Sequence, residues 1–144
     1  MSEVNEFESI VPYTDEEAVE ALGKLADHPA VMEISKSIFP DQKPEFLRTV
    51  LKSLKSIDEF QSLVMNKAVE WVLATTAHNF SYDGIANLKK IQGKFLALSN
   101  HRDIILDPAI TQVVLYRNGI PTTEIAVGSN LLSNKYIEYL IRSN

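Results

Sequence analysis

Apolar residues recur three and four positions apart through most of the first 80 residues, which is the spacing of one face of an α-helix. This spacing predicts four helices: one that follows Thr14 and ends at His28-Pro29, one from Ala30 to about Ile38, one opened by Asp41 or by Lys43-Pro44 with its apolar face over 46–54, and the longest from about Ile57 to Ala77. Four amphipathic helices joined by short loops predict a helical bundle over residues 1–80.

Two capping boxes, in which a Thr or Ser stands three residues before a Glu, mark helix starts in this part of the chain. They are Thr14–Glu17 and Ser56–Glu59. In such a box the hydroxyl accepts the N–H of the third helical residue, while the carboxylate reaches back to the N–H of the cap. Both pairs therefore predict where a helix begins.

After residue 80 the pattern changes to short apolar runs separated by turn residues. Asp83-Gly84 predicts a turn, and a short helical or irregular piece follows over 85–91. The run 95–98 is apolar without alternation, as in a strand buried on both faces of a parallel sheet, and 124–127 is a second strand candidate. Helices are predicted from Asp107-Pro108, with Asp107 as the N-cap, to Asn118-Gly119, and over 131–142.

Strand, helix, strand, helix is the order of an α/β fold, so residues 81–144 are expected to begin an α/β domain behind the helical bundle. Two parallel strands make a poor sheet. The domain is therefore expected to be incomplete and to take further strands from a continuation of the chain or from a partner. An open sheet edge invites self-association.

Composition and charge narrow the classes of function. The hydrophobic fraction of 45% and the charged fraction of 23% are those of an ordinary globular protein. The net charge of −5 argues against a nucleic-acid partner. The absence of cysteine removes disulfides and thiol chemistry. With no signal peptide and no apolar run near the roughly 20 residues that span a bilayer, we expect a cytoplasmic protein, with peripheral contact at the inner membrane face left open.

One of the three histidines stands in a setting suited to catalysis. His28 and His78 lie at helix ends, where a structural role is expected. His101 lies in a polar loop after the predicted strand 95–98, with Asp103 and Asp107 close behind it. A carboxylate that holds one imidazole nitrogen leaves the other as a general base. The alternative is that His101 is an ordinary loop residue and Asp107 only a helix cap, although one carboxylate can serve both roles.

Two other catalytic classes can be excluded on spacing. His101-Arg102-Asp103 has the letters of a protein-kinase catalytic loop, but that loop needs an asparagine five residues after its aspartate, and Pro108 stands there. The five glycines are scattered singly, so neither a phosphate-binding loop nor a dinucleotide fingerprint is present.

The stretch from Asn100-His101-Arg102-Asp103 to Asp107 resembles the first histidine–aspartate block of the glycerol-phosphate and lysophosphatidate acyltransferase family. The similarity extends over roughly residues 80–142, through Tyr82–Ile85, Pro108–Ile110, Val114–Ile120, Thr123–Gly128 and Asn130–Leu132. The resemblance implies transfer of a fatty acyl group from acyl-CoA or acyl-carrier protein to a glycerol-phosphate-type hydroxyl in phospholipid synthesis. It implies no metal and no bound cofactor.

The same resemblance implies roles for individual residues. His101 would be the general base and Asp107 the carboxylate that orients it, with Arg102, Asp103 and Asn100 as supporting or substrate-contacting residues. The family usually has four residues between the histidine and the aspartate, whereas five stand here. Asp103 occupies a position where serine is common, so it is a rival partner for His101.

The family's later blocks, an arginine-bearing strand and a Glu-Gly-Thr-Arg-like phosphate-binding segment, are not in the chain. We therefore expect a fragment, natural or cloned, that is inactive alone. The rival hypothesis is a non-catalytic helical interaction module whose second half serves as a docking surface.

Overall fold

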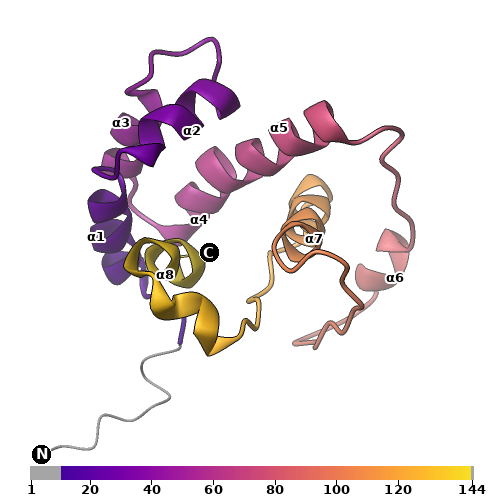
Figure 1. The fold of residues 1–144 in the computed structure, drawn as a ribbon. Coiled ribbons are helices and arrows are strands. Elements are labelled where there is room, and N and C mark those ends of the chain that lie inside the picture. The colour runs from indigo at the N-terminus through magenta and orange to yellow at the C-terminus, as the bar shows by residue number, and fades with distance from the viewer. Residues whose placement is uncertain (1–10, 144) are drawn as a thin grey trace, which may run out of the picture. The chain divides into compact units, whose positions relative to one another are not determined.

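The computed structural model describes residues 11–143, and these are helical without a sheet (Figure 1). The elements in chain order are α1 (Asp15–Leu25), α2 (Ala30–Ile38), α3 (Phe46–Ser53), α4 (Ile57–Phe60), the π-helical turn η2 (Gln61–Met65), α5 (Asn66–Thr76), α6 (Ile85–Leu88), α7 (Leu106–Arg117), the 3-10 turn η3 (Ser129–Ser133) and α8 (Lys135–Arg142). Within 11–143, no helix has both the length and the apolar character needed to cross a bilayer.

The prediction of an α/β fold is wrong. Helix accounts for 58% of the described residues, and these residues contain no strand. Residues 92–100 lie in no helix, and their backbone neither donates nor accepts a backbone hydrogen bond within the described chain. A strand is defined by its hydrogen-bonded neighbour, and neither 95–98 nor 124–127 has one here. Consequently there is no sheet edge among the described residues through which copies could pair.

Two helices of the first half begin at their predicted capping boxes, whereas α3 begins at Phe46, a few residues after the predicted starts at Asp41 or Lys43-Pro44. Thr14 caps α1 with a complete capping box, since its hydroxyl accepts the N–H of Glu17 and the Glu17 carboxylate accepts the N–H of Thr14. Ser56 caps α4 through the N–H of Glu59. The long helix predicted from Ile57 is present as α4, η2 and α5, with a π-turn in its middle.

The described chain forms two compact units. The first comprises 11–65 together with 126–143, and the second comprises 66–125. The core of the first unit is built from apolar faces of α1, α2, α3, α4 and η2, and its buried members are Leu22, Ala26, Val31, Leu47, Leu51, Leu54, Phe60 and Val64. Burying one such side chain contributes about 1.5–3 kcal/mol to folding.

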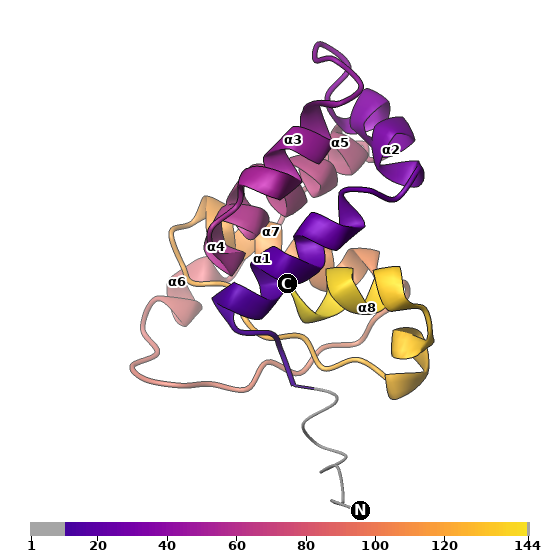
Figure 2. The ribbon, with the colours of Figure 1, turned by 90° about the vertical axis from the view of Figure 1, so that its left-hand side faces the viewer.

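Helix α8 belongs to the first unit because it packs against α1 (Figure 2). The N–H of Tyr13 donates to the carbonyl of Arg142 at 2.8 Å, and the Arg142 guanidinium donates to the carbonyl of Val11 at 2.9 Å. The same guanidinium lies 4.1 Å from the centre of the Tyr13 ring. These contacts join residues that are more than 100 positions apart in the sequence.

The second unit is a pair of packed helices with loops folded onto them. Val69 and Leu73 of α5 and Val113 of α7 are buried together. The guanidinium of Arg117 forms two hydrogen bonds with the carboxylate of Glu70, the longer of them 2.7 Å, and this pair joins the same two helices. Helix α7 is therefore held firmly, and it carries the candidate site at its first turn.

Candidate functional site

The loop 99–105 and the first turn of α7 form a small, closed hydrogen-bonded motif. The carboxylate of Asp107 accepts the N–H of Arg102 at 2.6 Å and the N–H of Asp103 at 3.1 Å. The carboxylate of Asp103 accepts the N–H groups of Ile105 and Leu106 at 2.8 and 2.7 Å. Each aspartate thus fixes the backbone that carries the other.

The N-cap position of α7 is Ile105, whose own side chain makes no capping hydrogen bond. The carboxylate of Asp103, rather than that of Asp107, accepts the N–H groups of Ile105 and Leu106 at this helix start. The helix begins at Leu106, and the first N–H groups of a helix have no partner within it. Asp103 supplies that partner, while Asp107 already lies in the first helical turn and reaches back to the loop. The prediction that Asp107 is the N-cap, with Pro108 as the first helical residue, is therefore wrong by a few residues.

The hydrogen bonds lower the pKa of both carboxyl groups. The N–H groups of Leu106 and Ile105 hold the pKa of Asp103 below its ordinary value. Those of Asp103 and Arg102 do the same for the pKa of Asp107, although the neighbouring charge of Asp103 opposes the shift. A charge on His101 is the smallest of the causes that lower the two pKa values.

Each carboxylate keeps one oxygen outside this motif. Both hydrogen bonds to Asp107 end on Oδ2, and both to Asp103 end on Oδ1. Among the described contacts no hydrogen bond is made by Oδ1 of Asp107 or by Oδ2 of Asp103. Each of these two oxygens can accept a further hydrogen bond, and among the described contacts neither makes a hydrogen bond or an ion pair with His101.

The predicted site residues lie together at the surface of the second unit. His101, Arg102 and Asn100 are exposed, as are their backbone neighbours.

The other two histidines differ from His101 in their surroundings. The Nδ1 atom of His28 accepts the N–H of Ala30 at 3.2 Å, and its ring packs against Tyr136 with 4.4 Å between centroids. His78 is exposed beyond the end of α5. Within 11–143 no three acidic or histidine side chains gather as metal ligands would.

Two further segments are attached to α7. The side chain of Gln112 accepts the N–H of Thr123 at 2.8 Å and donates to its hydroxyl at 3.0 Å. The side-chain amide of Asn118 donates to the hydroxyl of Tyr82 at 3.1 Å. Residues near 82 and 123, which belong to the stretch of family resemblance, are thereby brought to the helix that carries Asp107.

Sequence reasoning missed the apolar side chains beside His101. Leu96 and Leu98 precede it, Ile104 and Ile105 follow it, and all four are more than half exposed. The signal was present in the apolar run 95–98, but such a run is also typical of a buried strand.

Comparison with known proteins adds no relative. No protein-family model, no curated protein and no solved structure matches this chain.

Proposed function

We propose that the chain carries the general-base part of a glycerolipid acyltransferase site, with His101 as the base. The observation that supports this is the loop motif of 101–107. It holds two aspartates by four backbone hydrogen bonds, in the same loop as the exposed imidazole of His101. A carboxylate that orients a histidine is what general-base catalysis on a hydroxyl requires. The resemblance of this stretch to the family supplies the reaction class.

In the proposed reaction His101 takes the proton of a glycerol-phosphate-type hydroxyl as the oxygen attacks the carbonyl carbon of an acyl thioester. The new C–O bond forms and the C–S bond breaks. The imidazolium returns its proton to the departing thiolate, so the base is regenerated. Acyl-CoA or acyl-carrier protein is the donor, and no metal or bound cofactor takes part.

Asp107 is the proposed orienting carboxylate, because it stands on the first turn of a packed helix while Asp103 stands in the loop before it. Asp103 then acts as a positioning residue that accepts the N–H groups at the start of α7. Arg102 and Asn100 are exposed in the same loop and are available for the substrate.

The test is acyl transfer from a fatty acyl-CoA to glycerol 3-phosphate, measured in the longest natural polypeptide that contains this chain. His101→Ala is expected to lower kcat/KM by about 10²–10⁴-fold, which is the usual contribution of general-base catalysis. His78→Ala is the matched control, since it removes an exposed histidine from the same unit and should leave turnover unchanged. Full turnover in the His101→Ala variant would refute the proposal.

The pair Asp107→Asn and Asp103→Asn separates orientation from capping. Asparagine keeps an oxygen that can accept the same N–H groups, so both variants are expected to fold. Asp107→Asn should then lose kcat at unchanged KM, and Asp103→Asn should lose little. The opposite order would assign the orienting role to Asp103.

The helical content of the described chain favours one second candidate, the non-catalytic interaction module. Activity and binding assays on the wild-type protein distinguish the two candidates. An interaction module would neither transfer an acyl group nor bind acyl thioesters.

A further inference from the structure

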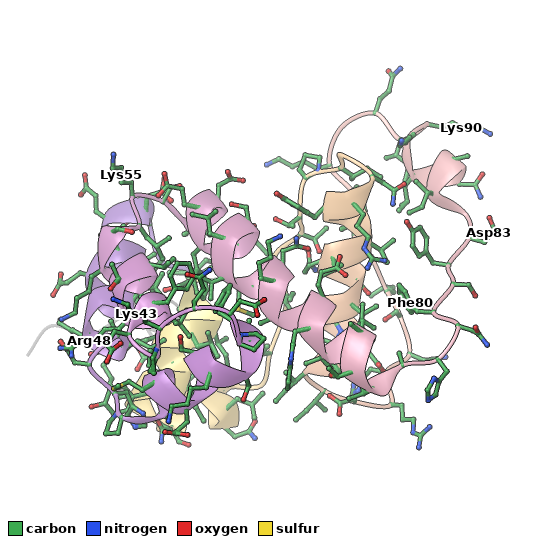
Figure 3. All side chains as sticks on the ribbon, turned by 90° about the horizontal axis from the view of Figure 1, so that it is seen from above. Lys43, Arg48, Lys55, Phe80, Asp83 and Lys90 are labelled. Atoms are coloured by element: carbon green, nitrogen blue, oxygen red, sulfur yellow. The ribbon has the colours of Figure 1, made fainter. Side chains whose placement is uncertain are left out.

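The stretch 84–102 has a charge composition unlike the rest of the chain. It contains four basic residues, Lys89, Lys90, Lys94 and Arg102, and no acidic one, on a chain whose net charge is −5. With Asp103, the next residue, residues 84–105 carry four basic and one acidic side chain, a net charge of +3. All four basic side chains are exposed. Figure 3 shows Lys90 extending from the end of α6 into solvent. Attraction to a negatively charged partner is therefore concentrated here.

The most exposed large apolar side chains of the described residues lie in or directly after this stretch. Leu98 is 86% exposed, Leu96 82%, Ile105 73% and Ile104 56%. Leucines in the core of the first unit, such as Leu22, are fully buried. Four aliphatic side chains are thus exposed within ten residues of sequence, and exposed apolar side chains in such number mark an interaction site.

The backbone explains how these side chains are presented. Residues 94–100 lie in no helix and no strand, and Leu96 and Leu98 are both more than four-fifths exposed. Gly93, with φ of +90°, turns the chain into this segment in a conformation that other residues rarely adopt. Since the peptide groups of 92–100 have no backbone partner in the described chain, they need water around them.

These properties fit one occupant. Aliphatic side chains beside lysines are typical of segments that lie in the interface of an anionic bilayer. A second copy would bring the same basic stretch against this one, and the like charges would repel. Nucleic acid would call for several stacking aromatic side chains, whereas Phe95 is the one Phe, Tyr or Trp of residues 84–105 and the four most exposed apolar side chains are aliphatic. Insertion into the hydrocarbon core of the bilayer is excluded, because peptide groups without hydrogen-bond partners must stay in contact with water.

We propose that residues 84–105 form a membrane-contact surface, which binds anionic phospholipid bilayers at headgroup depth. Leu96, Leu98, Ile104 and Ile105 enter the boundary between headgroups and acyl chains, while the lysines pair with lipid phosphates. The proposal does not depend on acyl transfer. If both proposals hold, His101 works at the bilayer surface, between Leu98 and Ile104 in the sequence, where a glycerolipid hydroxyl would meet it.

The first test is flotation of the purified chain with vesicles of phosphatidylcholine alone and with about a third of phosphatidylglycerol. Binding is expected only to the anionic vesicles and should weaken as salt screens the charges. Lys89→Gln with Lys90→Gln should weaken binding about 30-fold, a factor of about five for each lysine. Lys43→Gln with Lys55→Gln is the matched control, because both lysines are exposed in the first unit (Figure 3) and should have no effect.

Leu96→Gln with Leu98→Gln tests the apolar contribution and should weaken binding by more than tenfold. Both side chains are exposed, so folding is expected to survive, and circular dichroism checks it. Equal binding to neutral and anionic vesicles would overturn the proposal. So would wild-type binding by the Lys89→Gln, Lys90→Gln variant or by the Leu96→Gln, Leu98→Gln variant. A wild-type chain that does not bind vesicles but forms a dimer, which the leucine variant does not form, would also overturn it. In that case a second copy of the chain would cover this surface.

The depth of insertion can be measured directly. The chain has no cysteine, so Leu98→Cys provides a unique site for an environment-sensitive fluorophore, and Lys43→Cys provides the control. On anionic vesicles the label at 98 should shift to the blue, and nitroxides near the headgroup should quench it more than nitroxides at the acyl-chain end. Stronger quenching at the chain end, or the same spectrum as the control, would contradict headgroup-depth binding.

Discussion

The ion pair between Glu70 and Arg117 joins α5 to α7, and removing either partner is expected to lower the stability of the second unit. The guanidinium binds the carboxylate through two nitrogens, Nε and Nη2. Both side chains are about one-third exposed, at 33% and 34%. Arg117 also lies 5.7 Å from the centre of the Phe80 ring, so it makes a contact that Glu70 does not share.

The expected magnitude follows from this geometry. Exposed ion pairs contribute about 0.2–1 kcal/mol, and a two-point pair with partial burial belongs at the upper end. We expect Glu70→Gln to cost about 1 kcal/mol of the free energy of unfolding. Arg117→Gln should cost about 1.5 kcal/mol, because it also loses a cation–π contact of about 0.5 kcal/mol. A double-mutant cycle isolates the pair, and its coupling energy should be about 1 kcal/mol.

The pH dependence of the coupling has a definite sign. The hydrogen bonds from Arg117 lower the pKa of Glu70 in the folded protein below its value in the unfolded chain. The stabilisation is therefore complete above the pKa that Glu70 has in the unfolded chain. It is lost as the pH falls through the lower pKa that Glu70 has in the folded protein. Coupling should be full at pH 7 and should disappear in acid once Glu70 is protonated.

The assay uses the single tryptophan. Trp71 lies in α5, so its fluorescence during urea unfolding reports on the second unit without contribution from the first. Glu20→Gln is the control, because it removes the same charge from an exposed pair in the first unit and should leave the Trp71 transition unchanged. A coupling energy below about 0.2 kcal/mol at pH 7, or one that persists in acid, would refute the reasoning.

Two further predictions concern the first unit. Phe60 is 1% exposed, so Phe60→Ala should cost about 3–5 kcal/mol of the free energy of unfolding, measured by urea unfolding with circular dichroism. Leu63 is half exposed, so Leu63→Ala should cost less than about 1 kcal/mol in the same assay. Similar losses in the two variants would contradict the core described above. The hydroxyl of Ser35 is buried and accepts the N–H of Leu47 at 3.2 Å. Ser35→Ala should therefore cost about 1–3 kcal/mol in the same assay. Ser37→Ala, at an exposed position, should cost at most about 0.5 kcal/mol. Equal effects of the two serine variants would show that the bond between α2 and α3 is dispensable.

Helix positions were predictable because their signals are local. The caps at Thr14 and Ser56 and the left-handed stop at Gly119, with φ of +66°, all act within one turn of the residues that carry them. The loop of the candidate site was predictable only in part. The sequence places His101, Asp103 and Asp107 within seven residues, but which carboxylate accepts the N–H groups at the start of α7 depends on the path of the backbone between them.

The sequence by itself determined most of the helices, the caps at Thr14 and Ser56 and the composition of the loop that carries His101, since each depends on residues a few positions apart. Only the tertiary structure decided the fate of 95–98 and 124–127. An apolar run becomes a strand when another segment supplies its hydrogen bonds, and that partner lies far away in the chain or outside it. Without one, Leu96 and Leu98 face solvent, and a stretch expected at the centre of a sheet forms a surface beside His101.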